Sequence, residues 1–162
     1  MSDPTIQAAS ELLEDSLGAM RAAIVSTPPD ALNRRPAGEE TNSIAVLAVH
    51  SMHSTRMWLS VAMGVEPPDR DRPSEFLAEF AATAGGVDDL LASFDDLAGQ
   101  VRALLAAPGA AFDPGAVREA RTIGGVESVT GAYALMHALE HLREHVAHMQ
   151  LSLQVLGADQ AP

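Results

Sequence analysis

The sequence contains no cysteine. This absence excludes disulfide bonds, thiolate metal ligands and a cysteine nucleophile. Any thiol that takes part in the chemistry of this protein must therefore arrive with another molecule. Aromatic residues are also scarce, at 4% of the chain, whereas apolar residues in total make up 47%. We therefore expect a core built mainly from aliphatic side chains and methionine.

Basic residues are few, with ten Lys and Arg against 22 Asp and Glu and a formal net charge of −12. A nucleic-acid-binding protein needs a basic surface to displace counterions from phosphates, so we expect no nucleic-acid partner. No apolar run is long enough to cross a membrane. The first residues, Met1 to Pro4, lack the basic-then-apolar layout of a signal peptide. We therefore expect a cytoplasmic protein that does not enter a membrane.

The residues that are abundant favour helices, because Ala and Leu lose little side-chain freedom in a helix. Apolar residues recur at intervals of three and four in four regions of the chain. The predicted helices, with a break at Gly85-Gly86 in the third, run from Asp3-Pro4 to about Val25, from Asn42 or Ser43 to Met63, from about Ser74 to Ala107, and from Val126 to Leu156.

The segments between these helices indicate how the helices are joined. Residues 28–42 and 108–125 are rich in Pro and Gly and are predicted to be loops long enough to cross a bundle. Neither an alternating strand pattern nor an internal repeat is apparent. The sequence therefore predicts an all-α fold, a four-helix bundle with long crossover loops, formed by residues 1–162 as a single domain.

All six histidines fall on two of the predicted helices: His50, His53, His137, His141, His145 and His148. At 100° per residue, His50 shares its helix face with apolar residues such as Leu47 and Val61, and so points inward. On the last helix, His145 lies closest to the apolar stripe and His141 comes next. His137 and His148 lie nearer the polar face.

Two imidazoles four residues apart on one helix suit chelation of a single ion, and a third could come from an inward-facing histidine on another helix. The pattern predicts a divalent metal bound by His50, His141 and His145. Imidazole suits zinc and nickel, the metals we expect, as well as iron and copper, and three such ligands leave open positions for water or substrate. By itself, His50 also fits a core histidine bonded to a backbone carbonyl or a hydroxyl. His53 is either a second contact behind His50 or a histidine on the rim.

One similar motif is rejected. His141-Leu-Arg-Glu144-His145 matches the His-x-x-Glu-His pattern of inverted zinc peptidases. Those enzymes need a further carboxylate ligand well downstream, but the chain ends soon after His145. Glu144 also falls on the polar face of its helix. A peptidase is therefore not predicted.

Several segments together resemble the DinB/YfiT-like family of metalloenzymes. The segment Asn42-Ser-Ile-Ala-Val-Leu-Ala-Val-His50, followed by Trp58-Leu59, resembles the second helix of that family. The segment from His137 to Leu151, with its repeated histidines, is similar to the last helix. Residues 29–36 and 70–76 resemble the connecting segments. The resemblance covers about residues 5 to 156, and the order and spacing of the segments carry it.

The resemblance implies a four-helix bundle of unusual connectivity, generally a homodimer, with a metal held by His50, His141 and His145. Relatives with assigned activities include mycothiol-dependent maleylpyruvate isomerase and bacillithiol S-transferases. It therefore implies a metal-dependent S-transferase or isomerase that uses a low-molecular-weight thiol and acts on a small molecule. In this chain Ala147 and His148 stand where the family often has Gly-Gln after the last histidine.

Two other functions fit the same histidines. A metal-dependent hydrolase would use a bound hydroxide and would need a general base, but no inward-facing carboxylate is evident from the helical pattern. A helical dimer without catalytic activity, or a stress-linked binding module, would use the histidines, or a metal bound to them, for stability alone. Metal content and thiol binding distinguish these functions from the thiol-dependent enzyme.

Overall fold

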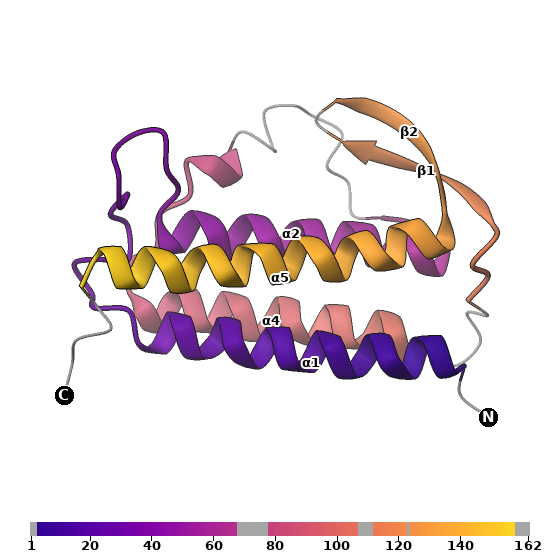
Figure 1. The fold of residues 1–162 in the computed structure, drawn as a ribbon, viewed down its shortest axis with the longest axis horizontal. Helices are drawn as coiled ribbons and strands as arrows, with labels where there is room; N and C mark the ends of the chain where they lie inside the picture. The colour runs from indigo at the N-terminus through magenta and orange to yellow at the C-terminus, as the bar shows by residue number, and fades with distance from the viewer. Residues whose placement is uncertain (1–2, 68–77, 107–111, 123, 158–162) are drawn as a thin grey trace.

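The computed structural model describes residues 3–67, 78–106, 112–122 and 124–157. Four long helices lie side by side (Figure 1): α1 (Pro4–Val25), α2 (Ile44–Met63), α4 (Val87–Ala106) and α5 (Gly131–Val155). A helical turn at residues 78–80 lies against α2, and an antiparallel hairpin of β1 (Val117–Thr122) and β2 (Gly125–Thr130) leads into α5. The prediction of a mainly helical bundle is confirmed.

The helix ends follow from local capping residues. The Asp3 side chain accepts hydrogen bonds from the backbone nitrogens of Thr5 and Ile6, and Pro4 occupies the first turn of α1. Ser43 caps α2 in the same way, and Gly64 ends that helix in the left-handed conformation, with a φ of 65°. The predicted ends of these helices are therefore confirmed.

The core consists of aliphatic and methionine side chains, as the composition predicted. Met20, Met52 and Met149 are at most 1% exposed, and α2 is buried on nearly all sides. Its serine and threonine hydroxyls are accommodated there because they donate to carbonyls of the preceding turn: Ser51 bonds the Leu47 oxygen at 2.6 Å, and Thr55 bonds the Ser51 oxygen at 2.7 Å. The helix that carries His50 is therefore the most buried of the four long helices.

The prediction for residues 108–130 was wrong. Instead of a loop followed by a helix from Val126, residues 117–122 pair with residues 125–130, and α5 begins only at Gly131. The Gly124-Gly125 turn joins the strands, with Gly125 at a φ of 122°, a conformation that glycine adopts readily. The β-branched residues of both strands favour the extended form over a further helical turn. Residues 108–111 lie outside the described residues.

The third predicted helical region is described in part. Residues 74–77, where it was expected to begin, lie outside the described residues, as does the predicted linker at 69–73. Residues 78–80 are helical, and the chain resumes as α4 at Val87, after the predicted break at Gly85-Gly86. This short turn becomes important at the candidate site.

One arginine of the hairpin joins the ends of two helices. The Arg118 guanidinium lies against Gly64, at the end of α2, and against Gly131, at the start of α5. A Cβ atom on Gly64 would lie 2.9 Å from Arg118 Nε, and one on Gly131 would collide with the backbone oxygen of Asp113. Both positions therefore require glycine for the close approach of the arginine and the chain.

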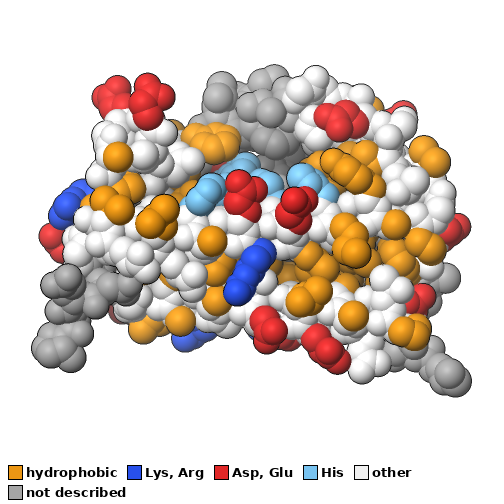
Figure 2. All heavy atoms as spheres, in the orientation of Figure 1, with side chains coloured by type: hydrophobic (Ala, Val, Ile, Leu, Met, Phe, Trp, Pro, Cys, Tyr) orange, Lys and Arg blue, Asp and Glu red, His pale blue; other side chains and the backbone are white. Residues whose placement is uncertain are grey.

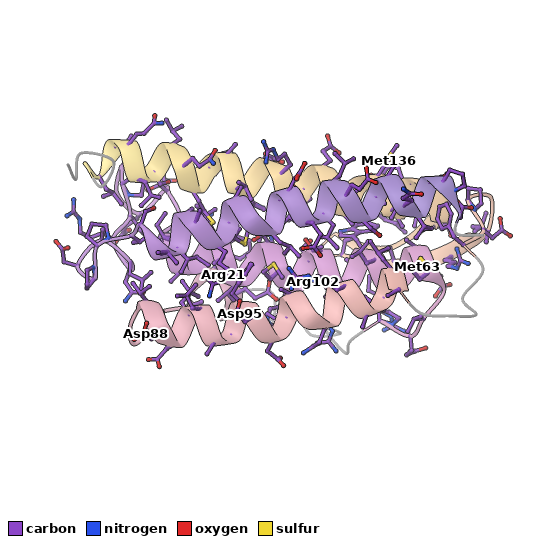
Figure 3. The ribbon with its side chains drawn as sticks, turned by 90° about the horizontal axis from the view of Figure 1, so that it is seen from below. Arg21, Met63, Asp88, Asp95, Arg102 and Met136 are labelled. Atoms are coloured by element: carbon purple, nitrogen blue, oxygen red, sulfur yellow. The ribbon has the colours of Figure 1, made fainter. Side chains whose placement is uncertain are left out.

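Two ion pairs join α1 to α4 on the side of the bundle away from the hairpin. Figure 3 labels three of the residues, Arg21, Asp95 and Arg102. Arg102 binds Glu14 through two contacts, at 2.6 and 2.8 Å, and this hydrogen bonding lowers the pKa of Glu14 below its usual value. Arg21 contacts Asp95 at 3.3 Å. These side chains are about half exposed, so each pair contributes little stability. Among the described residues, no helix is long and apolar enough to cross a membrane.

Candidate metal centre

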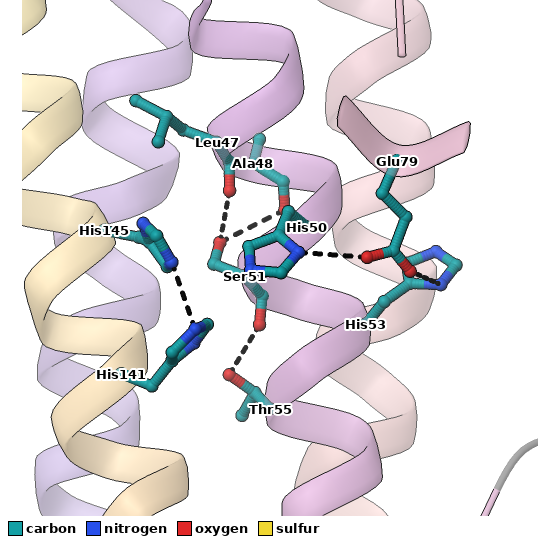
Figure 4. Close-up of polar contacts among 9 residues, drawn as sticks. All are labelled: Leu47, Ala48, His50, Ser51, His53, Thr55, Glu79, His141 and His145. Carbon is teal, nitrogen blue, oxygen red and sulfur yellow. Dashed lines mark hydrogen bonds and ion pairs between the residues drawn. The ribbon is translucent and has the colours of Figure 1, made fainter. Parts of the chain in front are cut away.

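His50 on α2 and His141 and His145 on α5 converge at one place between the two helices (Figure 4). One ligand nitrogen from each residue lies within 4.8 Å of the others. The His50 ring lies edge-on to both partners, with ring centroids 5.2 Å from each. These are the three residues that helical angles and spacing selected as metal ligands. We refer to them as the three-histidine cluster.

The distance between the two α5 imidazoles suits a shared ion. His141 Nε2 and His145 Nε2 are 3.2 Å apart. Two nitrogens bound to a tetrahedral zinc at 2.0–2.1 Å would be separated by about 3.3 Å. The spacing of four residues on a regular helix therefore produces a separation that a divalent ion can bridge without rearrangement of the backbone.

The environment of His145 favours the uncharged imidazole that a metal requires. Burial, followed by the proximity of His141, His50 and His148, lowers the pKa of His145 from 6.5 to about 3. Its ring is thus neutral at physiological pH, with a lone pair available for an ion. Within the described part of the chain, its Nδ1 atom is buried without a hydrogen-bond partner. The ring is held by its neighbours' packing rather than by a polar contact of that atom.

Glu79, from the turn at residues 78–80, is a site residue that sequence reasoning missed. Its Oε2 atom lies 3.0 Å from His50 Nδ1 and its Oε1 atom 3.5 Å from His53 Nδ1, and its side chain is only 8% exposed. A carboxylate oxygen accepts a hydrogen bond, so Nδ1 of His50 carries the hydrogen and Nε2 keeps the lone pair. A carboxylate placed behind a histidine in this way is typical of metal sites.

Two further contacts hold this turn in place. The Phe80 ring packs against the His50 ring, with centroids 4.6 Å apart. Arg35 donates to the Phe80 carbonyl at 3.2 Å and to the carbonyls of Glu39 and Thr41 at 2.7 Å. The position of Glu79 is thus coupled to the loop before α2. In the sequence, the single signal for Glu79 is one acidic residue within the apolar run Phe76-Leu-Ala-Glu-Phe-Ala-Ala.

The other three histidines lie next to residues of the cluster. The structure places His53 behind His50, in contact with Glu79 but 39% exposed. His137 stacks on Tyr133, with ring centroids 5.6 Å apart, and lies edge-on to Trp58. The ring of His148 is 5.7 Å from that of His145 and its side chain is 51% exposed. Neither His137 nor His148 belongs to the three-histidine cluster.

The cluster is accessible from one face of the molecule. Figure 2 shows histidine side chains on the floor of a hollow, with acidic side chains beside them. The Glu144 side chain lies 4.0 Å from His148 and is 59% exposed, as the helical angle predicted. A ligand from solvent could therefore reach an ion held at the base of the hollow.

Together, the bundle and the cluster define a class of helical proteins in which histidines from two long helices form a candidate metal site. The family model described as the DinB superfamily matches residues 12–149, a range that contains all three histidines, and the chain belongs to this superfamily. The family resemblance inferred from the sequence is therefore confirmed.

A solved structure supports the same fold. A conserved protein of Enterococcus faecalis is similar, with a TM-score of 0.71 and 16% sequence identity, over 97% of this chain and 99% of that chain. At this identity the likeness concerns the fold alone. No curated protein matches the chain.

Proposed function

We propose that this protein holds one divalent metal ion through His50, His141 and His145 and uses it to activate a small-molecule thiol, as an S-transferase or isomerase. The observation that carries the metal site is the convergence of three imidazoles within 4.8 Å, two of them 3.2 Å apart. Zinc and nickel are the proposed metals, since neutral imidazoles suit both.

The thiol is proposed from the chemistry of the chain and from its family. With no cysteine in the sequence, the protein cannot supply a thiol itself. A divalent ion with three imidazole ligands keeps open positions at which an incoming thiol would be favoured as thiolate. The three histidines would hold the ion at the base of the hollow, and Glu79 would keep His50 in the tautomer that binds it.

The arrangement of Glu79 argues against a hydrolase. The sequence showed no inward carboxylate, and the structure corrects this, because Glu79 is buried next to the cluster. Each of its oxygens, however, contacts an imidazole, one of His50 and one of His53. The carboxylate thus lies on the side of His50 away from α5. It supports a ligand rather than serving as a general base for metal-bound water.

Elemental analysis tests the metal site. Purified protein loaded with zinc or nickel should carry close to one ion per chain, and His145→Ala should carry far less. His148→Ala is the matched control, because it removes a histidine of the same helix that is outside the cluster, and it should keep the ion. If the unaltered protein stays far below one ion per chain after loading, the proposal is wrong.

Thiol activation is tested separately, with cobalt in place of the native metal. Mycothiol, bacillithiol and glutathione are added in turn, and a sulfur-to-cobalt charge-transfer band in the ultraviolet spectrum would report thiolate binding. Turnover is then assayed with electrophilic substrates. If no thiol binds at millimolar concentration, the enzymatic part of the proposal fails. Unfolding on metal removal would then favour a structural metal.

The homodimer implied by the resemblance remains a prediction. A surface groove of about 510 Å³ between α1 and α5 includes Leu12 and Met136, which are 56% and 65% exposed, with Asp15, Glu140 and Arg143 around them. An apolar centre flanked by both signs of charge can pair with a second copy across a two-fold axis. Sedimentation equilibrium of the unaltered protein and of Met136→Asp measures this directly.

A further inference from the structure

A pocket of about 350 Å³ lies beyond the three-histidine cluster, toward the C-terminal end of α5. The loop at residues 36–42, the first turn of α2 and the last turns of α5 form its walls. In Figure 1 this loop arches beside the C-terminal end of α5. We call this cavity the Leu151 pocket. Its volume falls within the range of small-molecule sites, which is about 300–1,000 Å³.

The walls of the pocket are largely apolar. Pro36, Ala37, Leu47, Leu151 and Val155 contribute apolar side chains. Leu151 and Val155 are 58% and 60% exposed, so the pocket opens to solvent on the α5 side. Burial of a ligand's apolar surface against these side chains would therefore favour binding.

The charged residues in and near the pocket restrict the charge of the ligand that it can bind. Among the described residues, no arginine lines it, and the chain contains no lysine. Arg35, the nearest candidate along the chain, is engaged with the carbonyls of Glu39, Thr41 and Phe80. The one acidic residue of the lining is Glu40, in a protein with a net charge of −12. An anionic group would be repelled here, whereas an uncharged one would not.

Two residues connect the pocket to the cluster. His148 lines the pocket, and its ring centroid is 5.7 Å from that of His145. Leu47 lines it from α2, one turn before Ser51, and Figure 4 shows Leu47 on the same side of α2 as His145. A molecule a few carbon atoms long could therefore place one end at the cluster and the other in the pocket.

We infer that the Leu151 pocket binds an uncharged, apolar portion of a small molecule whose donor atom binds the metal at the three-histidine cluster. This inference rests on the proposed metal site and specifies the substrate class for it. The portion in the pocket is a compact aliphatic or aromatic group; a ligand that carries a carboxylate or phosphate on that portion is rejected.

A series of 1-alkylimidazoles, from methyl to hexyl, tests the inference in cobalt-loaded protein. Each has the same uncharged donor, and binding is followed by the visible spectrum of cobalt. We expect the dissociation constant to fall by roughly two- to fourfold per added methylene until the pocket is filled. A hexyl analogue that ends in a carboxylate should lose this gain. Equal affinity along the series would overturn the inference.

Two matched variants test where the alkyl chain of these imidazoles, the tail, binds. Leu151→Asp places a charge at the wall of the pocket, and the gain with tail length should disappear. Val126→Asp alters an apolar side chain of similar exposure, 61% against 58%, on the hairpin and outside the lining of the pocket, and should leave the gain intact. A gain that survives Leu151→Asp would mean that the tail lies elsewhere, and the inference would be wrong. Since both side chains are exposed, neither substitution disrupts the core.

A separate experiment distinguishes failure of the proposed metal site from failure of the Leu151 pocket. If the protein binds no cobalt, the proposed function fails, and the pocket is tested in metal-free protein with 1-hexanol by two-dimensional NMR. Chemical-shift changes confined to residues 36–42 and 148–155 would support the pocket. An absence of changes there would overturn it independently of the metal.

Discussion

The two helices that form the cluster position their histidines by different means. On α2, His50 is oriented by a hydrogen bond to Glu79 and by the ring of Phe80. On α5, the spacing of His141 and His145 follows from helix geometry alone, and Nδ1 of His145 has no hydrogen-bond partner within the described residues. Helix geometry is thus enough to set the distance between two ligands. A single ligand from another element needs a partner that fixes its ring and its tautomer.

This difference implies separate effects of the two sides on metal binding. In the proposed metal site the α5 pair would chelate the ion and should determine whether an ion binds at all. The α2 side would contribute one ligand and its supporting carboxylate, and should determine how tightly the ion is held. Each of the following variants alters one side while leaving the other intact.

The largest effect is expected from removal of the α5 pair. The double variant His141→Ala/His145→Ala should abolish measurable metal binding, because only one of three ligands remains. His50→Ala leaves the chelating pair and should weaken binding by roughly 10²–10³-fold, since one ligand contributes about 3–4 kcal/mol. Competition with a chromophoric chelator measures both. Equal losses for the two variants would contradict the separation of roles.

A smaller effect is expected from Glu79→Gln. The amide can still accept a hydrogen bond but carries no charge, so metal affinity should fall by about 10–100-fold. Glu144→Gln, at an exposed carboxylate of α5, is the control and should leave affinity unchanged. The nitrogen chemical shifts of His50 in metal-free protein report its tautomer, and they should change in Glu79→Gln alone. Unchanged shifts would mean that Glu79 acts only by packing.

The pH dependence of stability tests the burial of His145. In the folded metal-free protein its pKa is about 3, against 6.5 for an ordinary histidine. Between these values the unfolded chain takes up a proton that the folded state excludes, so the free energy of unfolding falls as the pH falls below 6.5. Urea unfolding at pH 7 and pH 5.5 measures this loss. It should be smaller in His145→Gln and unaltered in His137→Gln, because His137 is not among the neighbours that lower the pKa of His145.

The smallest effect is expected from Arg35→Ala. This change removes the hydrogen bonds to the carbonyls of Glu39, Thr41 and Phe80, all at exposed positions, and should lower stability by roughly 1 kcal/mol. Metal affinity should fall by a few fold, because the turn that carries Glu79 is less firmly held. Arg102→Ala removes an ion pair between α1 and α4 and should cost about as little, 0.2–1 kcal/mol, without any change in metal affinity. A change in affinity in both variants would indicate a general effect of stability.

Much of the fold and of the cluster could be predicted from the sequence. Capping residues such as Asp3 and Ser43 act locally, so their effect is visible in the chain itself. The helical angle separates His141 and His145 from His137 and His148 because a regular helix fixes side-chain direction. His50 was predicted to face inward from its apolar neighbours.

The features that were missed depend on contacts distant in sequence. Glu79 is a single acidic residue among apolar neighbours, and its partner His50 is 29 residues away. The hairpin was missed because its strands bury little: Val117 and Val126 are 70% and 61% exposed, and Ala120 is the one fully buried residue of β1. Without a buried face, no alternation of apolar residues marks a strand.

The contact of Arg118 with Gly64 and Gly131 has a mechanical consequence. It joins the end of α2 to the start of α5 at one end of the bundle, and the three histidines of the cluster lie along those same two helices. A slip of one residue between the helices would displace His50 along the axis by about 1.5 Å relative to the α5 pair. Coordination bonds of about 2 Å do not tolerate such a displacement. The contact of Arg118 with both helices would thus help to keep the three histidines at the separation that the proposed metal site requires.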